Sequence, residues 1–234
     1  MTGNVMFAGR AALPRGHKRI EAPFIMHTYG CTMDDQEVVP TGLRVQASLF
    51  SHFCRLSDHA AGGYVKTMEV YLLRHGLAVE RGTAGFEDDA ARPLTTRGKR
   101  QLVAVAAAMK QMGLHFDLIL SSPLVRARQT AEIVARELKQ KKRLALSTTL
   151  APGGQPKLLA AELTRLESPP ETVLLIGHEP DLSRLLSLWT SGGTQLQVDF
   201  KKAGLAKLEM EKPAAGKCAT LAWLLTPKQM KWMV

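Results

Sequence analysis

From residue 68 to the end of the chain, short apolar runs alternate with longer segments that repeat apolar residues at the helical period. The expected strands cover residues 69–73, 117–120, 144–146 and 172–176, and the expected helices cover 95–113, 123–138, 156–166 and a stretch after Pro180. Two further strands, over 204–210 and 219–225, follow without a helix between them. Pro123 suits the first position of its helix, and Gly113 suits a helix stop.

The alternation predicts an α/β fold, namely a three-layer α/β/α sandwich whose mostly parallel sheet carries antiparallel edge strands. The predicted domain covers residues 68–234. Residues 1–67 hold four of the seven His, scattered Gly and Pro, and no long amphipathic helix. We therefore expect residues 1–67 to be a disordered extension, or translated sequence upstream of the true start.

Composition excludes several classes of protein. The chain is 45% hydrophobic and 22% charged, which is typical of globular domains, and no run approaches the roughly 20 apolar residues of a membrane span. Its net charge of +10 favours anionic partners, but aromatic residues make up only 6% and no nucleic-acid-binding motif is present. Cys31, Cys54 and Cys218 form no CxxC pair, which favours the reducing cytoplasm, and adding His52 and His59 gives no closed zinc pattern. We expect neither a membrane nor a nucleic-acid partner.

Three of the predicted strands end in polar residues with one chemical theme. The first is followed by Arg74-His75-Gly76, the second leads into a helix that carries Arg126, and the third is followed by His178. Ligands of such sheets bind beyond the carboxyl ends of the strands, so the topology should bring these side chains to one edge. The amino ends of the helices near Pro123 and Pro180 would add dipoles that favour an anion.

Two arginines and two histidines together suit a tetrahedral dianion such as phosphate. We expect a backbone carbonyl to hold one nitrogen of His75 as N–H, which leaves the other nitrogen free to attack phosphorus in line. Arg74, Arg126 and His178 would then stabilise the charge on the equatorial oxygens. Gly76 should let the backbone turn sharply near the ligand. Because these fixed cations can replace a metal ion, we expect no metal and no cofactor.

The residues also resemble a known family. The resemblance rests on three segments in this order: Leu73-Arg74-His75-Gly76, residues 121–131 (SSPLVRARQTA), and Gly177-His178-Glu179-Pro180. In combination they resemble the histidine phosphatase superfamily and, within it, the SixA-type phosphohistidine phosphatases. The resemblance covers residues 68–234 and implies the α/β/α fold with metal-independent phosphate hydrolysis. By position it implies that His75 becomes phosphohistidine and that Arg74, Arg126 and His178 form the phosphate pocket.

One departure from the larger members of that superfamily concerns the proton donor. Those members have a Glu and an Asn after the triplet and use a separate carboxylic acid, whereas residues 77–80 here are LAVE. Phosphohistidine leaves as imidazole and needs less proton donation than an alkoxide, so we expect phosphohistidine to be the preferred substrate. Asp89 is the nearest candidate acid, and Arg92 is a candidate for orienting the loop or for touching the phosphoprotein. Ser122 and Thr130 could contact phosphate, but we expect Ser122 to cap the helix that follows it.

The leading prediction is therefore a phosphatase that acts on phosphohistidine-bearing signalling or phosphotransfer proteins. A phosphatase of a small phosphorylated metabolite or nucleotide is one alternative, and a non-catalytic phosphate-binding module is another. So short a chain leaves little sequence for a lid, and the shallow pocket that follows favours a protein substrate. The oligomeric state is left open.

Overall fold

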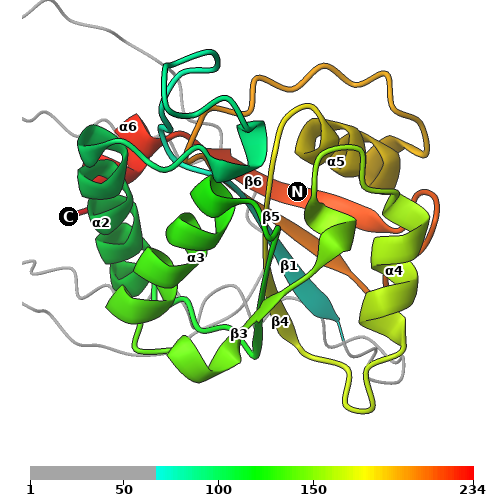
Figure 1. The fold of residues 1–234 in the computed structure, drawn as a ribbon. Coiled ribbons are helices and arrows are strands. Elements are labelled where there is room, and N and C mark those ends of the chain that lie inside the picture. The colour runs from blue at the N-terminus through cyan, green and yellow to red at the C-terminus, as the bar shows by residue number, and fades with distance from the viewer. Residues whose placement is uncertain (1–66) are drawn as a thin grey trace, which may run out of the picture. The chain divides into compact units, whose positions relative to one another are not determined.

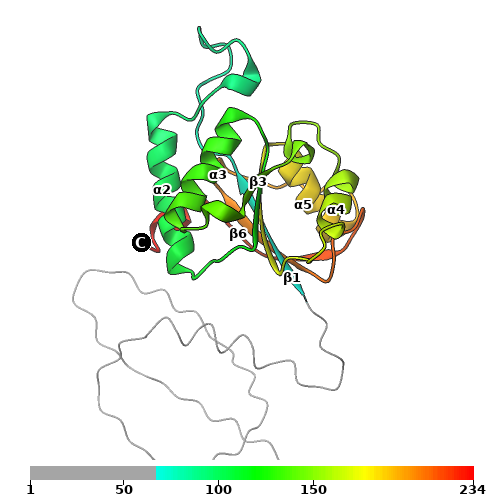
Figure 2. The same ribbon diagram turned by 60° about the horizontal axis from the view of Figure 1, so that its bottom comes forward.

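The computed structural model describes residues 67–234 (Figures 1 and 2). Apart from Thr67, the predicted extension over residues 1–67 lies outside the described residues. The described part contains one six-stranded sheet with the order β3-β2-β4-β1-β5-β6. The strands are β1 (Met68–Arg74), β2 (Leu118–Ser121), β3 (Leu144–Leu146), β4 (Thr172–Gly177), β5 (Leu205–Met210) and β6 (Ala219–Leu225).

Four of these strands pair with one another in parallel, and the other two join the sheet by antiparallel pairing. β4 pairs in parallel with both β1 and β2, and β2 pairs in parallel with β3. β5 and β6 extend the other edge in antiparallel pairing. The register sets Arg74 opposite Gly177 and Ser121 opposite Ile176, so three carboxyl ends stop at nearly the same level of the sheet. The mostly parallel sheet with antiparallel edge strands is thus confirmed.

Helices cover both faces of the sheet, as Figures 1 and 2 show. α2, α3 and α6 lie on one face, and α4 and α5 lie on the other. Within residues 67–234 the helices are α2 (Thr96–Gln111), α3 (Val125–Glu137), α4 (Pro156–Thr164), α5 (Asp181–Ser191) and α6 (Pro227–Lys231), with 3-10 turns η1 (Asp89–Ala91), η2 (Lys141–Arg143) and η3 (Thr148–Leu150). None of these helices combines the length and the apolar composition needed to cross a bilayer.

The alternation of side chains along the central strands produces two hydrophobic cores. In β1, Tyr71 and Leu73 pack under α2 and α3, whereas Val70 and Leu72 pack under α4 and α5. Successive side chains of a strand point to opposite faces, so a strand that is buried on both faces contributes apolar residues to both cores. Its sequence is therefore an unbroken apolar run. This burial on both faces explains why the strands were recognisable from the sequence.

The start of α3 differs from the prediction. The helix begins at Val125, and Leu124 is its extended N-cap residue, so Pro123 lies before the helix and not at its first position. Ser122 and Pro123 therefore form a short loop between β2 and α3. This loop places Arg126 in the first turn of the helix, beside the end of the sheet.

Candidate active site

The segment Arg74-His75-Gly76 leaves β1 along a backbone that is fixed on several sides. Arg74 N–H donates to the Gly204 carbonyl at 3.1 Å, and His75 N–H donates to the Gly177 carbonyl at 3.1 Å. Gly76 N–H donates to Thr130 Oγ1, also at 3.1 Å. The residue before β5, the end of β4 and helix α3 thus each hold one residue of the triplet, and the side chains of Arg74 and His75 project from a rigid strand end.

His75 is buried at this strand end with a defined tautomer. Its Nδ1 lies 2.8 Å from the carbonyl oxygen of Gly76, which can only accept, so Nδ1 carries the proton. Nε2 then keeps a free lone pair, the arrangement expected of a nucleophile. The ring of His178 faces it, with ring centres 5.0 Å apart and planes inclined by 52°.

His178 is oriented by Ser122, which the sequence prediction treated as a helix cap. His178 Nε2 lies 2.8 Å from Ser122 Oγ, and that oxygen also accepts from Leu124 N–H at 3.3 Å. When the hydroxyl donates to Nε2 of His178, the ring proton lies on Nδ1, which has no partner among the described residues. Ser122 therefore belongs to the site, and the cap prediction is wrong because the helix starts three residues later.

The two arginines are anchored by backbone carbonyls from distant parts of the chain. Arg74 Nη1 donates to Phe200 O at 2.6 Å, in the loop before β5. Arg126 Nη1 donates to Asp89 O at 2.6 Å, in η1. Both carbonyls come from loops that follow no motif, which is why the sequence did not indicate them.

Polar atoms without a partner concentrate at this place. Four buried side-chain nitrogen or oxygen atoms within residues 67–234 have no hydrogen-bond partner in the protein, and three of them are Arg74 Nε, Arg126 Nε and His178 Nδ1. A buried polar group without a partner is costly, so the convergence of three in one site points to an anionic ligand that accepts from them. The structure thus brings together Arg74, His75, Arg126 and His178 at the carboxyl edge of the sheet.

The electrostatic environment keeps both histidines neutral. Burial lowers the pKa of His75 to about 3, and the charges of Arg126 and Arg74 act in the same direction. Burial also lowers the pKa of His178 to about 4, with Arg126 as the next cause. Since a protonated imidazole has no lone pair to attack with, these shifts keep His75 in its nucleophilic form across the neutral range.

Asp89 and Arg92, the two loop candidates, lie beside Arg126. Asp89 accepts from Arg126 through Oδ2 at 2.9 Å and from Arg92 through Oδ1 at 2.7 Å. Burial by itself raises the pKa of Asp89, but the hydrogen bonds from Arg92, Arg126 and Arg81, with the charge of Arg126, outweigh it and lower the pKa to about 2. A carboxyl in this state holds no proton at neutral pH, which argues against the role of general acid.

Gly76 was predicted to allow a sharp backbone turn, but in the structure its lack of a side chain serves close packing. It does not adopt a positive φ, and a Cβ at this position would lie 2.7 Å from Leu102 Cδ1 and 3.3 Å from Leu94 Cδ2. The close packing of β1 against α2 therefore excludes a side chain. Thr130 was a candidate for a phosphate contact, and its hydroxyl instead donates to Arg126 O at 2.7 Å while it accepts from Gly76 N–H at 3.1 Å.

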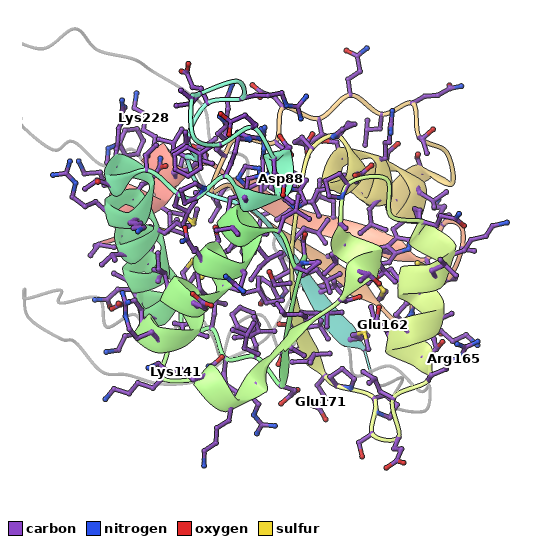
Figure 3. The ribbon with its side chains drawn as sticks, in the orientation of Figure 1. Asp88, Lys141, Glu162, Arg165, Glu171 and Lys228 are labelled. Carbon is purple, nitrogen blue, oxygen red and sulfur yellow. The ribbon has the colours of Figure 1, made fainter. Side chains whose placement is uncertain are left out.

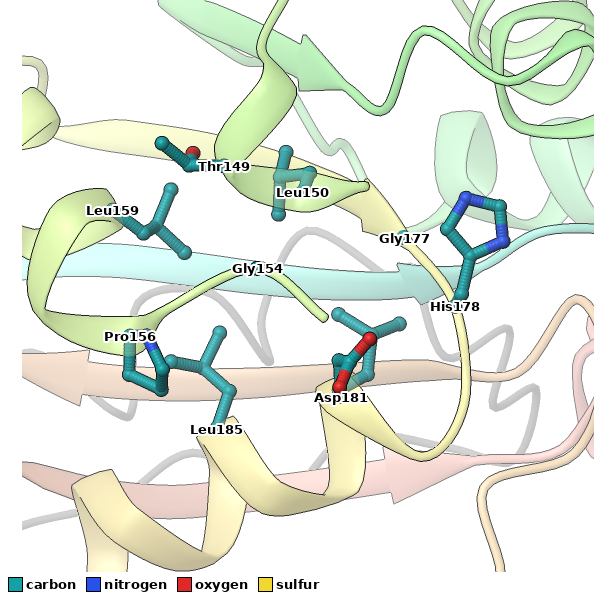
Figure 4. A pocket seen from close by; sticks show the side chains of 10 residues that line it. Thr149, Leu150, Gly154, Pro156, Leu159, Gly177, His178, Asp181 and Leu185 are labelled. Carbon is teal, nitrogen blue, oxygen red and sulfur yellow. The ribbon is translucent and has the colours of Figure 1, made fainter. Parts of the chain in front are cut away.

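A small cavity of about 20 Å³ borders the site on the side of α4 and α5 (Figure 4). Leu150, Leu159 and Leu185 are among the apolar side chains that line it, and His178 lies at one end of the group. The cavity has room for about one water molecule, too little for a phosphoryl group with its leaving side chain. The polar groups around His75, and not this cavity, define the candidate site. Among the residues that the structure describes, no three His, Cys, Asp or Glu are placed to share a metal ion.

Several known proteins are similar to this chain. The sequence model of the histidine phosphatase superfamily (branch 1) matches residues 70–149, which include His75 and Arg126. An uncharacterised protein of Picosynechococcus sp. is 43% identical over 143 residues, which cover 60% of this chain and 84% of that protein.

Two comparisons concern SixA proteins. The phosphohistidine phosphatase SixA of Escherichia coli K12 is 28% identical over 165 residues, which cover 70% of this chain and 97% of SixA. A solved structure of the protein histidine phosphatase SixA complexed with tungstate matches with a TM-score of 0.60 at 28% identity, covering 69% of this chain and 98% of that one.

Proposed function

The chain belongs to the histidine phosphatase superfamily, and from this we propose that it is a phosphohistidine phosphatase that works through a covalent intermediate on His75. In this proposal the substrate is a phosphohistidine on a signalling or phosphotransfer protein. The observation that carries the proposal is the neutral His75 whose Nδ1 is tied to Gly76 O, surrounded by unpartnered donors of Arg74, Arg126 and His178.

The first chemical step transfers the phosphoryl group to the enzyme. His75 Nε2 attacks phosphorus, the Nε2–P bond forms, and the P–N bond of the substrate breaks in line with it. The leaving imidazole departs neutral when its other nitrogen carries a proton. Arg74 and Arg126 stabilise the negative charge on the equatorial oxygens, and His178 Nδ1–H donates a further hydrogen bond to it.

The second step returns the enzyme to its starting state. Water attacks the phosphorus of phosphorylated His75, the Nε2–P bond breaks, and inorganic phosphate leaves with the oxygen of that water. The same donors serve both steps, because the phosphoryl group stays in place while the leaving and attacking groups exchange. We propose that neither step needs a metal ion, since the guanidinium groups are already placed as the fixed cations.

The leaving group favours phosphohistidine over phosphoserine. Asp89, the carboxyl that contacts Arg126, is ionised and held by arginines, so the site offers it no role in protonating an alkoxide. Imidazole leaves without that help. The similarity to SixA over nearly its whole length supports the same assignment, although 28% identity does not specify the substrate.

The experiment that tests the proposal supplies a phosphohistidine-bearing phosphotransfer domain and follows phosphate release in the presence of EDTA. A phosphoserine protein serves as the matched second substrate, and His75→Ala serves as the matched enzyme. We expect release from phosphohistidine only, unaffected by EDTA, with an acid-labile phosphate on the wild-type enzyme that His75→Ala lacks. Turnover in His75→Ala, equal turnover of phosphoserine, or loss of activity with EDTA would each contradict the proposal.

The same experiment separates the two alternatives. A metabolite or nucleotide phosphatase would form the His75 label from small phosphate esters and leave the phosphoprotein intact. A non-catalytic module would form no label and would retain its phosphate affinity in His75→Ala.

A further inference from the structure

Arg126 would contact the phosphoryl group, yet both of its terminal nitrogens are held by one residue of a separate loop. Nη1 donates to Asp89 O at 2.6 Å and Nη2 donates to Asp89 Oδ2 at 2.9 Å, while Nε has no partner in the described protein. The guanidinium is a flat group with a fixed fork of donors. Fixing its two ends therefore fixes the direction of Nε as well.

The same carboxylate collects two more guanidinium groups on its other oxygen. Arg92 donates to Asp89 Oδ1 through Nη2 at 2.7 Å and through Nε at 3.0 Å, and Arg81 Nε donates at 3.1 Å. The three arginines range from buried Arg126 to Arg81, whose side chain is 81% exposed. Like charges so close together repel, and the single carboxylate between them offsets that repulsion.

The loop that carries Asp89 is itself closed firmly at its base. Val79 N–H donates to Pro93 O at 2.9 Å, and Thr95 N–H donates to Leu77 O at 2.9 Å. Figure 3 shows Asp88, next to Asp89, in the upper half of the view, with Lys141 and Glu171 near the bottom. The loop thus reaches over the carboxyl end of the sheet from a rigid base, and Asp89 is the residue through which it holds Arg126.

We propose that Asp89 is a positioning residue for phosphoryl transfer and not the general acid. It holds the guanidinium of Arg126 in place beside His75 and thereby connects loop 79–94 to the phosphate site. The assignment rests on the proposed function for the identity of the transferred group. Both oxygens of the carboxylate accept from guanidinium groups, and these contacts stabilise the ionised form over the protonated form that a general acid needs. A pKa of about 2 leaves about 10⁻⁵ of the carboxyls protonated at pH 7.

The test compares Asp89→Ala and Asp89→Asn with Asp88→Asn. Asp88 is a matched control because it is the same residue type in the same loop. Within the described residues, its carboxylate accepts from the backbone N–H of Ala90 and contacts no arginine. Two readouts are taken: kcat/KM on 4-nitrophenyl phosphate and on phenyl phosphate, whose leaving groups differ in acidity, and inhibition by orthovanadate. A role confined to loop stability would move neither readout in enzyme that remains folded.

We expect Asp89→Ala to lose about 100-fold in kcat/KM, by the same factor on both phosphates, because misplacing a binding group costs that much. Orthovanadate inhibition should weaken in parallel. Asp89→Asn should lose less, since its amide oxygen still accepts from one arginine, and Asp88→Asn should stay within about twofold of wild type on the same scale. Should Asp89→Ala fail to fold, the near-isosteric Asp89→Asn carries the comparison.

Two results would overturn the assignment. If Asp89→Asn loses far more on phenyl phosphate than on 4-nitrophenyl phosphate while vanadate inhibition is unchanged, Asp89 is a proton donor. If folded Asp89→Ala keeps wild-type kcat/KM and vanadate inhibition, Asp89 does not position the site.

Failure of the proposed function would look different. A chain that hydrolyses no phosphate compound would refute the phosphatase assignment. Calorimetric binding of orthovanadate to wild type and Asp89→Ala would still measure whether Asp89 positions Arg126, with equal affinities counting against it.

Discussion

Burial of His75 and His178 beside two arginines lowers the stability of the folded protein at acidic pH. Both pKa values, about 3 and about 4, lie below the ordinary value near 6.5. Between about pH 4 and pH 6.5 the unfolded chain therefore binds protons that the folded protein does not, and stability falls as the pH falls through this window. Above pH 6.5 the two histidines add no pH dependence.

This reasoning predicts a loss of about 2 kcal/mol of unfolding free energy per histidine between pH 7 and pH 5. Urea unfolding at the two pH values measures it. The double variant His75→Gln with His178→Gln should show a smaller difference between pH 7 and pH 5 than wild type. An equal difference in both proteins would show that these histidines are not held neutral by burial.

At the scale of elements, the site depends on how closely β1 approaches α2. Gly76 at the end of β1 packs against Leu102, which is fully buried in α2, with a would-be Cβ only 2.7 Å from Cδ1. The adjoining N–H groups of the triplet are held by β4, β5 and α3. Moving this strand end would therefore disturb His75 directly.

Gly76→Ala should destabilise the protein by about 1–3 kcal/mol through overpacking. Leu102→Ala alone should cost about 2–5 kcal/mol through a cavity. The double variant should cost less than the two single costs together, because the added methyl group occupies part of the space that Leu102 leaves. Urea unfolding of the four proteins measures the coupling, and strictly additive costs would contradict the packing explanation.

At the scale of the whole domain, the sheet separates two hydrophobic cores, and they pack against different parts of the site. The core under α2 and α3 contacts the helix that carries Arg126 and Thr130, whereas α5 packs its buried face, including Leu186 and Trp189, on the other side. Stability and activity can therefore be separated by choosing the core that is altered.

Leu186→Ala, fully buried in α5, should cost about 2–5 kcal/mol in unfolding free energy. Its kcat/KM per folded molecule should stay close to wild type, because Leu186 packs in the core on the α4 and α5 side of the sheet. Leu158→Ala is the matched control, since Leu158 is 55% exposed and its loss should change stability by less than about 0.5 kcal/mol. A tenfold fall in kcat/KM for folded Leu186→Ala would show that the two faces are coupled.

The sequence predicted the sheet and the convergence of Arg74, His75, Arg126 and His178 for the same physical reason. Buried parallel strands appear as apolar runs, and the residues after them must meet at one edge. The partners of these residues were not predictable in this way. Phe200 O and Asp89 reach the arginines from loops whose course is set by tertiary contacts, and Ser122 was assigned to a cap because the start of α3 was placed too early.

The central claim is that four side chains from three strand ends surround one phosphoryl group. A crystal structure with orthovanadate tests it most directly. We predict vanadium bonded to His75 Nε2, with vanadate oxygens accepting from Arg74, Arg126 and His178 Nδ1. Vanadium bonded to another residue, or vanadate bound away from the carboxyl edge of the sheet, would contradict the account.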